Sequence, residues 1–403
     1  SEIPDPVTNI AWESMAMVHP DTLKQKEWKQ GDKLQLKTGK GTIEAPIYSY
    51  HGVCPDLVVM QTGMGHENYG RFAQGFGSNP MALLDVNTES ATAAVSYLTA
   101  LSTAKKVGKS RKLPKTDGSR SQYERKIAES EFVGHKADDH HAKEGLTMNT
   151  FPLTLPIEEG YSKKRDVYRP HKHDGYRWGM IVDLDRCIGC SACSAACYAE
   201  NNLGVVGKEQ VIKGREMSWL RIERYEDKND KERLIFLPML CQHCDNAPCE
   251  AVCPVYAPYH GKEGLNNQIY NRCIGTRFCA QNCPYKVRRF NWHTWEWPKP
   301  LNLQLNPNVT VRSKGVMEKC SFCVQRIKEA HNNAKNENRK IRDGEVLPAC
   351  VQTCPTDALV FGNFMDKNSR IYQLAKDHRA YQVLGYLNTK PAVIYLKKIL
   401  QKV

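Results

Sequence analysis

The cysteines of this chain constrain its fold more than any other feature of the sequence. Fifteen of the sixteen lie in four groups within residues 187–354 of a 403-residue chain. The groups are Cys187, Cys190, Cys193 and Cys197; Cys241, Cys244, Cys249 and Cys253; Cys273, Cys279 and Cys283; and Cys320, Cys323, Cys350 and Cys354. A tight turn with cysteines separated by two residues places three thiolates around one iron–sulfur cluster, and a cysteine farther on reaches the neighbouring cluster. The spacing therefore predicts a chain folded around several such clusters.

A proline follows the last cysteine in three of the groups, after Cys253, Cys283 and Cys354, whereas Tyr198 follows Cys197. Proline in this place is part of the pattern of bacterial two-cluster ferredoxins. Two other uses of cysteine fit less well. Disulfide frameworks are typical of short secreted chains. A structural zinc site pairs two Cys-x-x-Cys motifs and needs no triplet followed by a fourth cysteine.

The ligands sort into four sets if the first and fourth groups form one ferredoxin-like unit and the second and third groups form another. The first site then comprises Cys187, Cys190, Cys193 and Cys354. The second site comprises Cys197, Cys320, Cys323 and Cys350, and the third comprises Cys241, Cys244, Cys249 and Cys283. The remaining set, the three-cysteine site, comprises Cys253, Cys273 and Cys279.

Threonine stands in the third group where the spacing calls for a cysteine, at Thr276. A hydroxyl is a poor ligand for a soft iron–sulfur site. Three thiolates suit a [3Fe–4S] cluster, which lacks the iron at the unliganded corner. The alternative is a [4Fe–4S] cluster with the Thr276 oxygen or a water at that corner. The other three sites are predicted to hold [4Fe–4S] clusters, and no metal other than cluster iron is expected.

The order of the groups, the Cys-Ile-Gly-Cys opening at Cys187 and the Cys-Pro-Tyr-Lys stretch at Cys283 carry a resemblance to a known family. Residues 177–396 resemble the four-cluster iron–sulfur subunits that partner molybdopterin oxidoreductases. The resemblance implies that the last cysteine of each group crosses to the paired group. It also implies that members without a cysteine at the Thr276 position carry a [3Fe–4S] cluster there, nearest a quinone-handling membrane subunit.

The first ninety residues indicate a small β-rich domain. Strands are expected over residues 33–38 and 42–48, joined by a tight turn at residues 39–41, with a third strand over residues 57–60. This stretch resembles the C-terminal β-barrel that closes over a molybdopterin dinucleotide in molybdenum oxidoreductases. That domain normally ends a longer chain, so Ser1 is expected to mark a processed or partial start. His66 is interpreted as a turn residue rather than a pterin contact.

A β-rich head followed by a four-cluster domain resembles the fused iron–sulfur subunit of bacterial alternative complex III, a quinol:electron-acceptor oxidoreductase. The resemblance implies no molybdopterin, an integral-membrane quinol-binding partner, cytochrome c-type haem subunits as acceptors, and a membrane-associated complex on the periplasmic face. No catalytic acid or base is predicted in this chain. The alternative is the electron-transfer subunit of a molybdenum-dependent reductase of the polysulfide or tetrathionate type, which carries electrons towards a molybdopterin site.

Composition excludes other classes of function. The formal charge is +13, but four thiolate-bound clusters contribute roughly −8, which leaves about +5 and argues against a nucleic-acid partner. No run approaches the ~18 apolar residues of a membrane span, so membrane contact is expected through partner subunits. Cys54 lies outside the groups and is interpreted as a small buried hydrophobe.

The predicted fold class is α+β, with three parts. These are a β-barrel-type domain over residues 1–95, an extended linker over residues 96–174, and a tandem ferredoxin-like four-cluster domain with insertions over residues 175–403. The linker is expected to order on other subunits, and its pair His140-His141 is interpreted as a solvated loop rather than a metal site. In the third part we expect a hairpin with its tip at residues 228–230 and a helix over residues 369–384. The aromatic and basic stretch over residues 285–297 is expected to dock on the membrane subunit.

Overall fold

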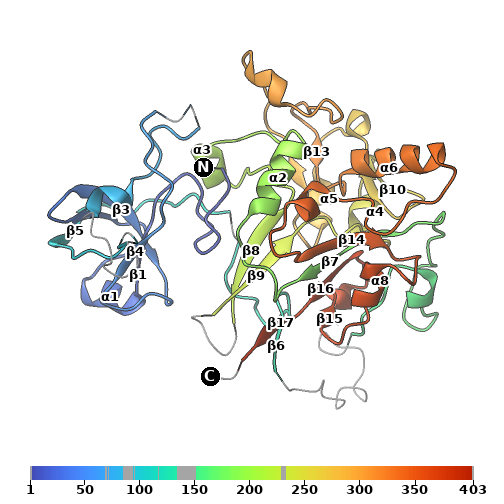
Figure 1. Ribbon diagram of the computed structural model, residues 1–403, viewed down its shortest axis with the longest axis horizontal. Coiled ribbons are helices and arrows are strands. Elements are labelled where there is room, and N and C mark those ends of the chain that lie inside the picture. Colours follow the sequence, from blue (N-terminus) through green and yellow to red (C-terminus); the bar gives the residue numbers. More distant parts are fainter. Residues whose placement is uncertain are drawn as a thin grey trace. The chain divides into compact units, whose positions relative to one another are not determined.

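The computed structural model describes residues 2–68, 70, 72–84, 94, 96–116, 118–133, 151–227 and 233–401. The chain forms two compact units. The first comprises residues 1–118 with two later segments, 206–216 and 226–234, and the second comprises the rest. Their helices and strands are labelled in Figure 1.

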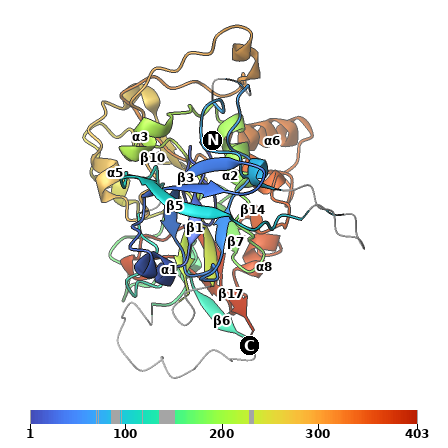
Figure 2. The same ribbon diagram turned by 90° about the vertical axis from the view of Figure 1, so that its left-hand side faces the viewer.

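A five-stranded sheet in the order β4-β1-β3-β2-β5 organises the first unit. Figure 2 labels its strands β1, β3 and β5. Its strands are β1 (Ala16–Val18), β2 (Lys33–Lys37), β3 (Thr42–Ser49), β4 (Val58–Met60) and β5 (Thr103–Gly108). β1 runs parallel to β3, and the other neighbours are antiparallel. Leu34 and Leu36 alternate with polar residues along β2, so both side chains reach the core, where Ile47 of β3 also lies.

The predicted hairpin between β2 and β3 is confirmed, from Lys33 opposite Pro46 to Lys37 opposite Thr42. Thr38 shapes its turn, because the Thr38 hydroxyl oxygen accepts hydrogen bonds from backbone N–H groups two and three residues farther on, at 3.1 and 3.3 Å. The same unit contains α1 (Pro20–Gln25), η1 (Pro80–Leu83) and α3 (Lys208–Ile212).

The prediction of a β-barrel-type domain is wrong, because in the described residues this sheet is open. β4 and β5 form its two edges and do not pair with each other. A barrel requires every strand to pair on both sides, and β4 offers only three residues for such pairing. Cys54 was expected to be buried, and the structure places it on the surface.

Part of the predicted linker belongs to sheets. β5 is an edge strand of the first unit, and β6 (Ser130–Phe132) pairs in parallel with β17 (Lys398–Leu400) in the second. The pair His140-His141 lies outside the described residues. Residues 157–166 of the predicted linker also belong to the second unit, and Asp166 contacts Lys390, in the C-terminal part of the chain.

A four-stranded sheet and several strand pairs form the second unit (Figure 1). The sheet has the order β14-β7-β16-β15, with β7 (Trp178–Asp183), β14 (Leu359–Asn363), β15 (Ala380–Tyr381) and β16 (Val393–Leu396). Besides β6 with β17, the strand pairs are β8 (Arg221–Glu226) with β9 (Leu234–Met239), β10 (Pro258–His260) with β11 (Asn266–Gln268), and β12 (Arg289–Phe290) with β13 (Met317–Glu318). β7 lies inside the sheet, antiparallel to β14 and parallel to β16.

The helices of the second unit are short. They are α2 (Ala192–Glu200), α4 (Pro248–Ala251), α5 (Phe278–Asn282), α6 (Val324–Asn336), α7 (Ala349–Gln352) and α8 (Arg370–Leu374), with 3-10 turns η3 (Glu158–Gly160), η4 (Tyr270–Arg272), η5 (Leu301–Gln304) and η6 (Gly385–Leu387). β8 and β9 form the predicted hairpin, whose tip at residues 228–230 lies outside the described residues. The helix expected over residues 369–384 is wrong beyond Leu374, because Arg379 turns to pair with Asp183 at 3.1 Å and β15 follows.

A buried ion pair connects residues 157–166 to the C-terminal part of the second unit. Lys390 Nζ lies 2.9 Å from Asp166 Oδ1, and both side chains are almost fully buried. Burial alone would raise the pKa of Asp166, but hydrogen bonds from Ser162 N, Lys390 and Asn388 outweigh it and hold the pKa well below the usual range. The carboxylate is therefore ionised in the folded protein at neutral pH.

Replacing Lys390 alone should destabilise the second unit. Lys390→Met removes the buried cation 2.9 Å from Asp166 and leaves Arg165, 3.1 Å away, to compensate the carboxylate, which costs up to about 3–5 kcal/mol of unfolding free energy. The double variant Asp166→Asn/Lys390→Met should lose less, because no buried carboxylate then remains. Denaturant unfolding at pH 7 measures both, since the contribution of a carboxyl with a lowered pKa is complete above about pH 4. Equal stability of wild type and Lys390→Met would contradict the assignment.

Candidate iron–sulfur sites

The first and third cysteine groups fold into the same backbone turn. In the first, Gly189 and Ser191 have φ values of 71° and 62°, and in the third Gly275 and Arg277 have 75° and 64°. Positive φ is natural for glycine and uncommon for other residues. A helix follows each turn, α2 in the first group and α5 in the third. Thr276 therefore occupies the backbone position that Cys190 occupies in the first group, and both residues are exposed.

The second and fourth groups repeat a different local structure. Each Cys-x-x-Cys turn has a positive φ just before its second cysteine, 44° at His243 and 54° at Phe322. A one-turn helix then carries the next cysteine, α4 in one group and α7 in the other. The thiol at each Cys-Pro accepts a hydrogen bond from a backbone N–H four residues on, at 3.3 Å both at Cys253 and at Cys354.

Tertiary packing joins the groups in the predicted pairs. Helix α2 of the first group packs on α7 of the fourth, and α4 of the second packs on α5 of the third. The strands agree: β7, which leads into the first group, pairs with β14, which follows the fourth. Likewise β11, which leads into the third group, pairs with β10, which follows the second. The second unit thus contains two ferredoxin-like halves, each built from two cysteine groups.

The thiols of each four-cysteine site lie close enough to influence one another. Burial raises the pKa of Cys193 to about 12, and the other three thiols of the first site add to the rise. The same two causes raise the pKa of Cys350 in the second site and of Cys244 in the third. Such groups ionise when a metal cation compensates the charge, and the thiolate is the ligand of iron. The donor sets therefore fit iron–sulfur clusters.

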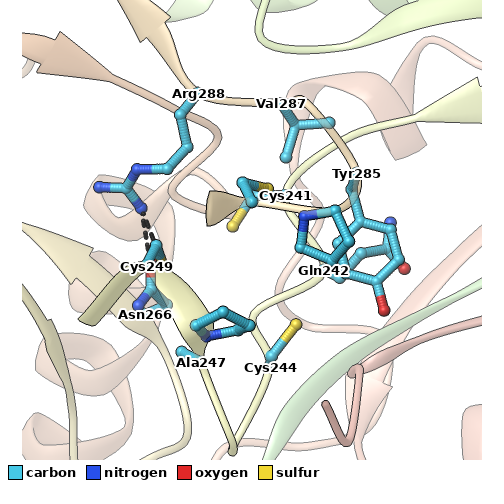
Figure 3. Close-up of a pocket in the computed structure, with 12 residues that line it drawn as sticks. Cys241, Gln242, Cys244, Ala247, Cys249, Asn266, Tyr285, Val287 and Arg288 are labelled. Carbon is cyan, nitrogen blue, oxygen red and sulfur yellow. Dashed lines mark hydrogen bonds between the residues drawn. The ribbon is translucent and has the colours of Figure 1, made fainter. Parts of the chain in front are cut away.

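A hollow of about 320 Å³ lies among the thiols of the third site, part of it open to solvent (Figure 3). Ala247, Pro248, Pro284 and Val287 line it with apolar surface. Within the described residues, no three His, Cys, Asp or Glu side chains are arranged to hold a single metal ion. The thiols around this hollow are the donors that an iron–sulfur cluster requires.

The structure brings together part of the three-cysteine site. Cys279 is buried in an apolar cluster with Cys249 and Met317, and Cys273 packs against that cluster. The Cys273 thiol accepts a hydrogen bond from Met317 N at 3.3 Å. Cys253 follows α4, which packs on the helix that carries Cys279. The ligand assignment of all four sites stays a prediction.

Side chains that donate to thiols were missed by the sequence analysis, among them Asn201 and Arg288. Asn201 Nδ2 lies 3.5 Å from Cys197 Sγ and 3.9 Å from Cys323 Sγ, which both belong to the second site. Arg288 donates from a terminal nitrogen to Cys249 Sγ at 3.3 Å (Figure 3). Asn201 could have been found as the residue one helical turn after Cys197. Arg288 stands among several basic residues, and nothing in the sequence separates it from the exposed ones.

Two family models of the 4Fe-4S dicluster domain match the chain, over residues 186–257 and 232–301. The chain is also 40% identical over 230 residues to the iron–sulfur cluster-binding subunit of menaquinone reductase from Nitratidesulfovibrio vulgaris. That alignment covers 55% of this chain and 89% of the relative. The chain belongs to the 4Fe-4S dicluster iron–sulfur subunits. It is thus an electron-transfer subunit of an oxidoreductase complex.

Other members of the family differ in the complex they serve. The chain is 36% identical over 242 residues to iron–sulfur subunit 1 of the Hdr-like menaquinol oxidoreductase of Archaeoglobus fulgidus, covering 55% of this chain and 83% of the relative. It is 32% identical over 235 residues to a tetrathionate reductase subunit of Salmonella typhimurium, covering 57% and 77%. In the part of this iron–sulfur subunit that the structure describes, no helix is long and apolar enough to cross a membrane.

Removing one ligand of the second site should lower its iron content. Cys350→Ala leaves three thiols, as at the three-cysteine site, so iron analysis should show the loss of at least the iron that Cys350 holds, while the other three sites keep their ligands. Cys54→Ala is the matched control, since Cys54 is exposed and lies in the first unit. Iron content that is unchanged in Cys350→Ala, or that falls equally in the control, would contradict the assignment.

Proposed function

We propose that this chain is the iron–sulfur subunit of a membrane-associated quinol:electron-acceptor oxidoreductase of the alternative complex III type. Three [4Fe–4S] clusters would occupy the first, second and third sites, and one [3Fe–4S] cluster the three-cysteine site. Bound there, the clusters supply one-electron carriers between quinol and cytochrome c-type haem subunits. The chain's own residues contribute thiolates, N–H donors to sulfur and a dry surround.

The observation that carries the proposal is the position of Thr276. The backbone around it has the conformation of the turn around Cys190, so the change affects the ligand atom and leaves the loop intact. A hydroxyl oxygen is a hard donor, and iron–sulfur clusters take soft thiolate ligands. A [3Fe–4S] cluster has no iron at the corner that lacks a thiolate ligand, so the three thiols that are present are enough to bind it.

The surface around the three-cysteine site supports a protein partner there. Tyr256, Ile274 and Phe278 are 70%, 65% and 57% exposed, and all three belong to the loops that carry Cys253, Cys273 and Cys279. Arg277 lies beside them, 5.0 Å from the ring of Trp292. Exposed aromatic and aliphatic side chains with an arginine are typical of interface centres. We assign this surface to the integral-membrane quinol-binding subunit.

Part of the aromatic stretch over residues 285–297, which was expected to dock on the same subunit, packs against other residues of this chain. Trp295 lies so close to Gly204 that a Cβ there would be 2.1 Å from the indole ring. Trp292 faces Arg277. The proposed docking surface therefore centres on the cysteine loops, and Trp292 extends it.

The second candidate function is electron transfer to a molybdopterin site in a reductase. The relative that is named as part of a tetrathionate reductase favours it. The names of two other relatives contain menaquinone or menaquinol, which favours the quinol-linked proposal.

A reciprocal exchange of Thr276 and Cys190 tests the cluster types. The oxidised complex should give a nearly isotropic EPR signal from a [3Fe–4S] cluster, and Thr276→Cys should abolish it by supplying the missing thiolate. Cys190→Thr is the matched variant, because the same turn in the first site should then lose its fourth iron and produce a second signal of this kind. An oxidised spectrum that is the same in wild type and Thr276→Cys would refute the proposed cluster.

Metal and haem analysis of the purified complex separates the two functions. We expect no molybdenum or tungsten, and we expect haem c in the complex, because the proposed acceptors are cytochrome c subunits. Inductively coupled plasma mass spectrometry and the pyridine haemochrome spectrum measure both. About one molybdenum or tungsten per complex would establish the reductase instead.

A further inference from the structure

A buried guanidinium lies between the third site and the three-cysteine site. Arg288 is 5% exposed, and its Nη1 lies 3.3 Å from Cys249 Sγ, a ligand of the third site (Figure 3). Arg288 also makes a side-chain hydrogen bond to Cys279, which belongs to the three-cysteine site. The charge of Arg288 therefore acts on both sites.

The guanidinium is held in place by two amides of one strand. Nη1 also donates to Asn266 Oδ1 at 3.2 Å, and Nη2 donates to Gln268 Oε1. Asn266 and Gln268 begin and end β11, which pairs with β10. These acceptors are neutral, so they orient the guanidinium without cancelling its charge. A fixed fork of this kind suits arginine better than lysine.

The other ferredoxin-like half has a different donor at its thiols. Asn201, which is neutral, donates to Cys197 there. The cation nearby, Lys319, donates to the carbonyl oxygen of Cys320 at 2.7 Å rather than to a sulfur. Arg326 is paired with Glu200 at 2.8 Å, which offsets its charge. The half that contains Thr276 is therefore distinguished by a charged donor in contact with a thiol.

We propose that Arg288 is a positioning residue that raises the reduction potential of both clusters in this half. A fixed positive charge stabilises the reduced cluster, which carries one more negative charge than the oxidised one, and hydrogen bonds to sulfur act in the same direction. The inference rests on the proposed function only in that clusters occupy these two sites, whatever their iron number. Electrons are then retained preferentially in the half that carries Thr276.

EPR-monitored redox titration of the purified complex tests the role of Arg288. In Arg288→Met, both clusters of this half should become harder to reduce by at least about tenfold in the equilibrium constant, which is about 59 mV for a one-electron couple. The first and second clusters should keep their potentials. Arg288→Lys retains the charge and should recover most of the shift. Arg339→Gln, a surface variant away from every cysteine, should change none of the four.

A second variant tests the proposal independently if Arg288→Met fails to retain its clusters. Gln268→Glu keeps Arg288 and places a carboxylate against its Nη2, and the Gln268 Nε2 has no hydrogen-bond partner among the described residues, so the exchange breaks no such contact. Both potentials should again fall, by less than in Arg288→Met. Unchanged potentials with full cluster content, in either variant, would overturn the proposal. A complex that lacks clusters at these two sites in the wild type would refute the proposed function instead.

Discussion

Buried thiols that can ionise only against iron are the constraint on which the second unit depends. Ten of the fifteen grouped cysteines are buried, and burial together with the neighbouring thiols raises the pKa values of Cys193, Cys244 and Cys350. Three of the helices that carry grouped cysteines, α4, α5 and α7, have four or five residues, too few to be stable alone. Cluster binding therefore supplies folding free energy to this unit, as metal binding does in other small metal-centred folds.

Each of the two backbone conformations of the cysteine loops occurs twice, once in each ferredoxin-like half. This repetition explains the pairing of groups. Positive φ at Gly189 and Gly275 lets each chain segment wrap one cluster before a helix leads away. In each half this helix packs on the short helix of the partner group, α2 on α7 and α5 on α4. The predicted crossing of the last cysteine would be a consequence of this packing.

Features set by local spacing could be predicted from the sequence, and features set by packing could not. Cysteine separations indicate which thiols share a turn, and the alternation of Leu34 and Leu36 with polar residues indicates the hairpin. The open sheet was not predictable, because β5 joins it from a distant segment of the chain. The contact of Arg288 with Cys249 was equally hidden, since it depends on how residues after Cys283 fold back over the third site.

Two departures from the internal repeat fall in the same ferredoxin-like half. Thr276 stands where the repeat has a cysteine, and Arg288 brings a cation into contact with a thiol, whereas Asn201, which donates to a thiol of the other half, is neutral. The first change removes a negative ligand and the second adds positive charge, so both favour electrons in this half. The net direction of transfer is set by the potentials of the electron donor and acceptor. On the proposal above, these two side chains decide which half of the nearly symmetric fold retains the electrons.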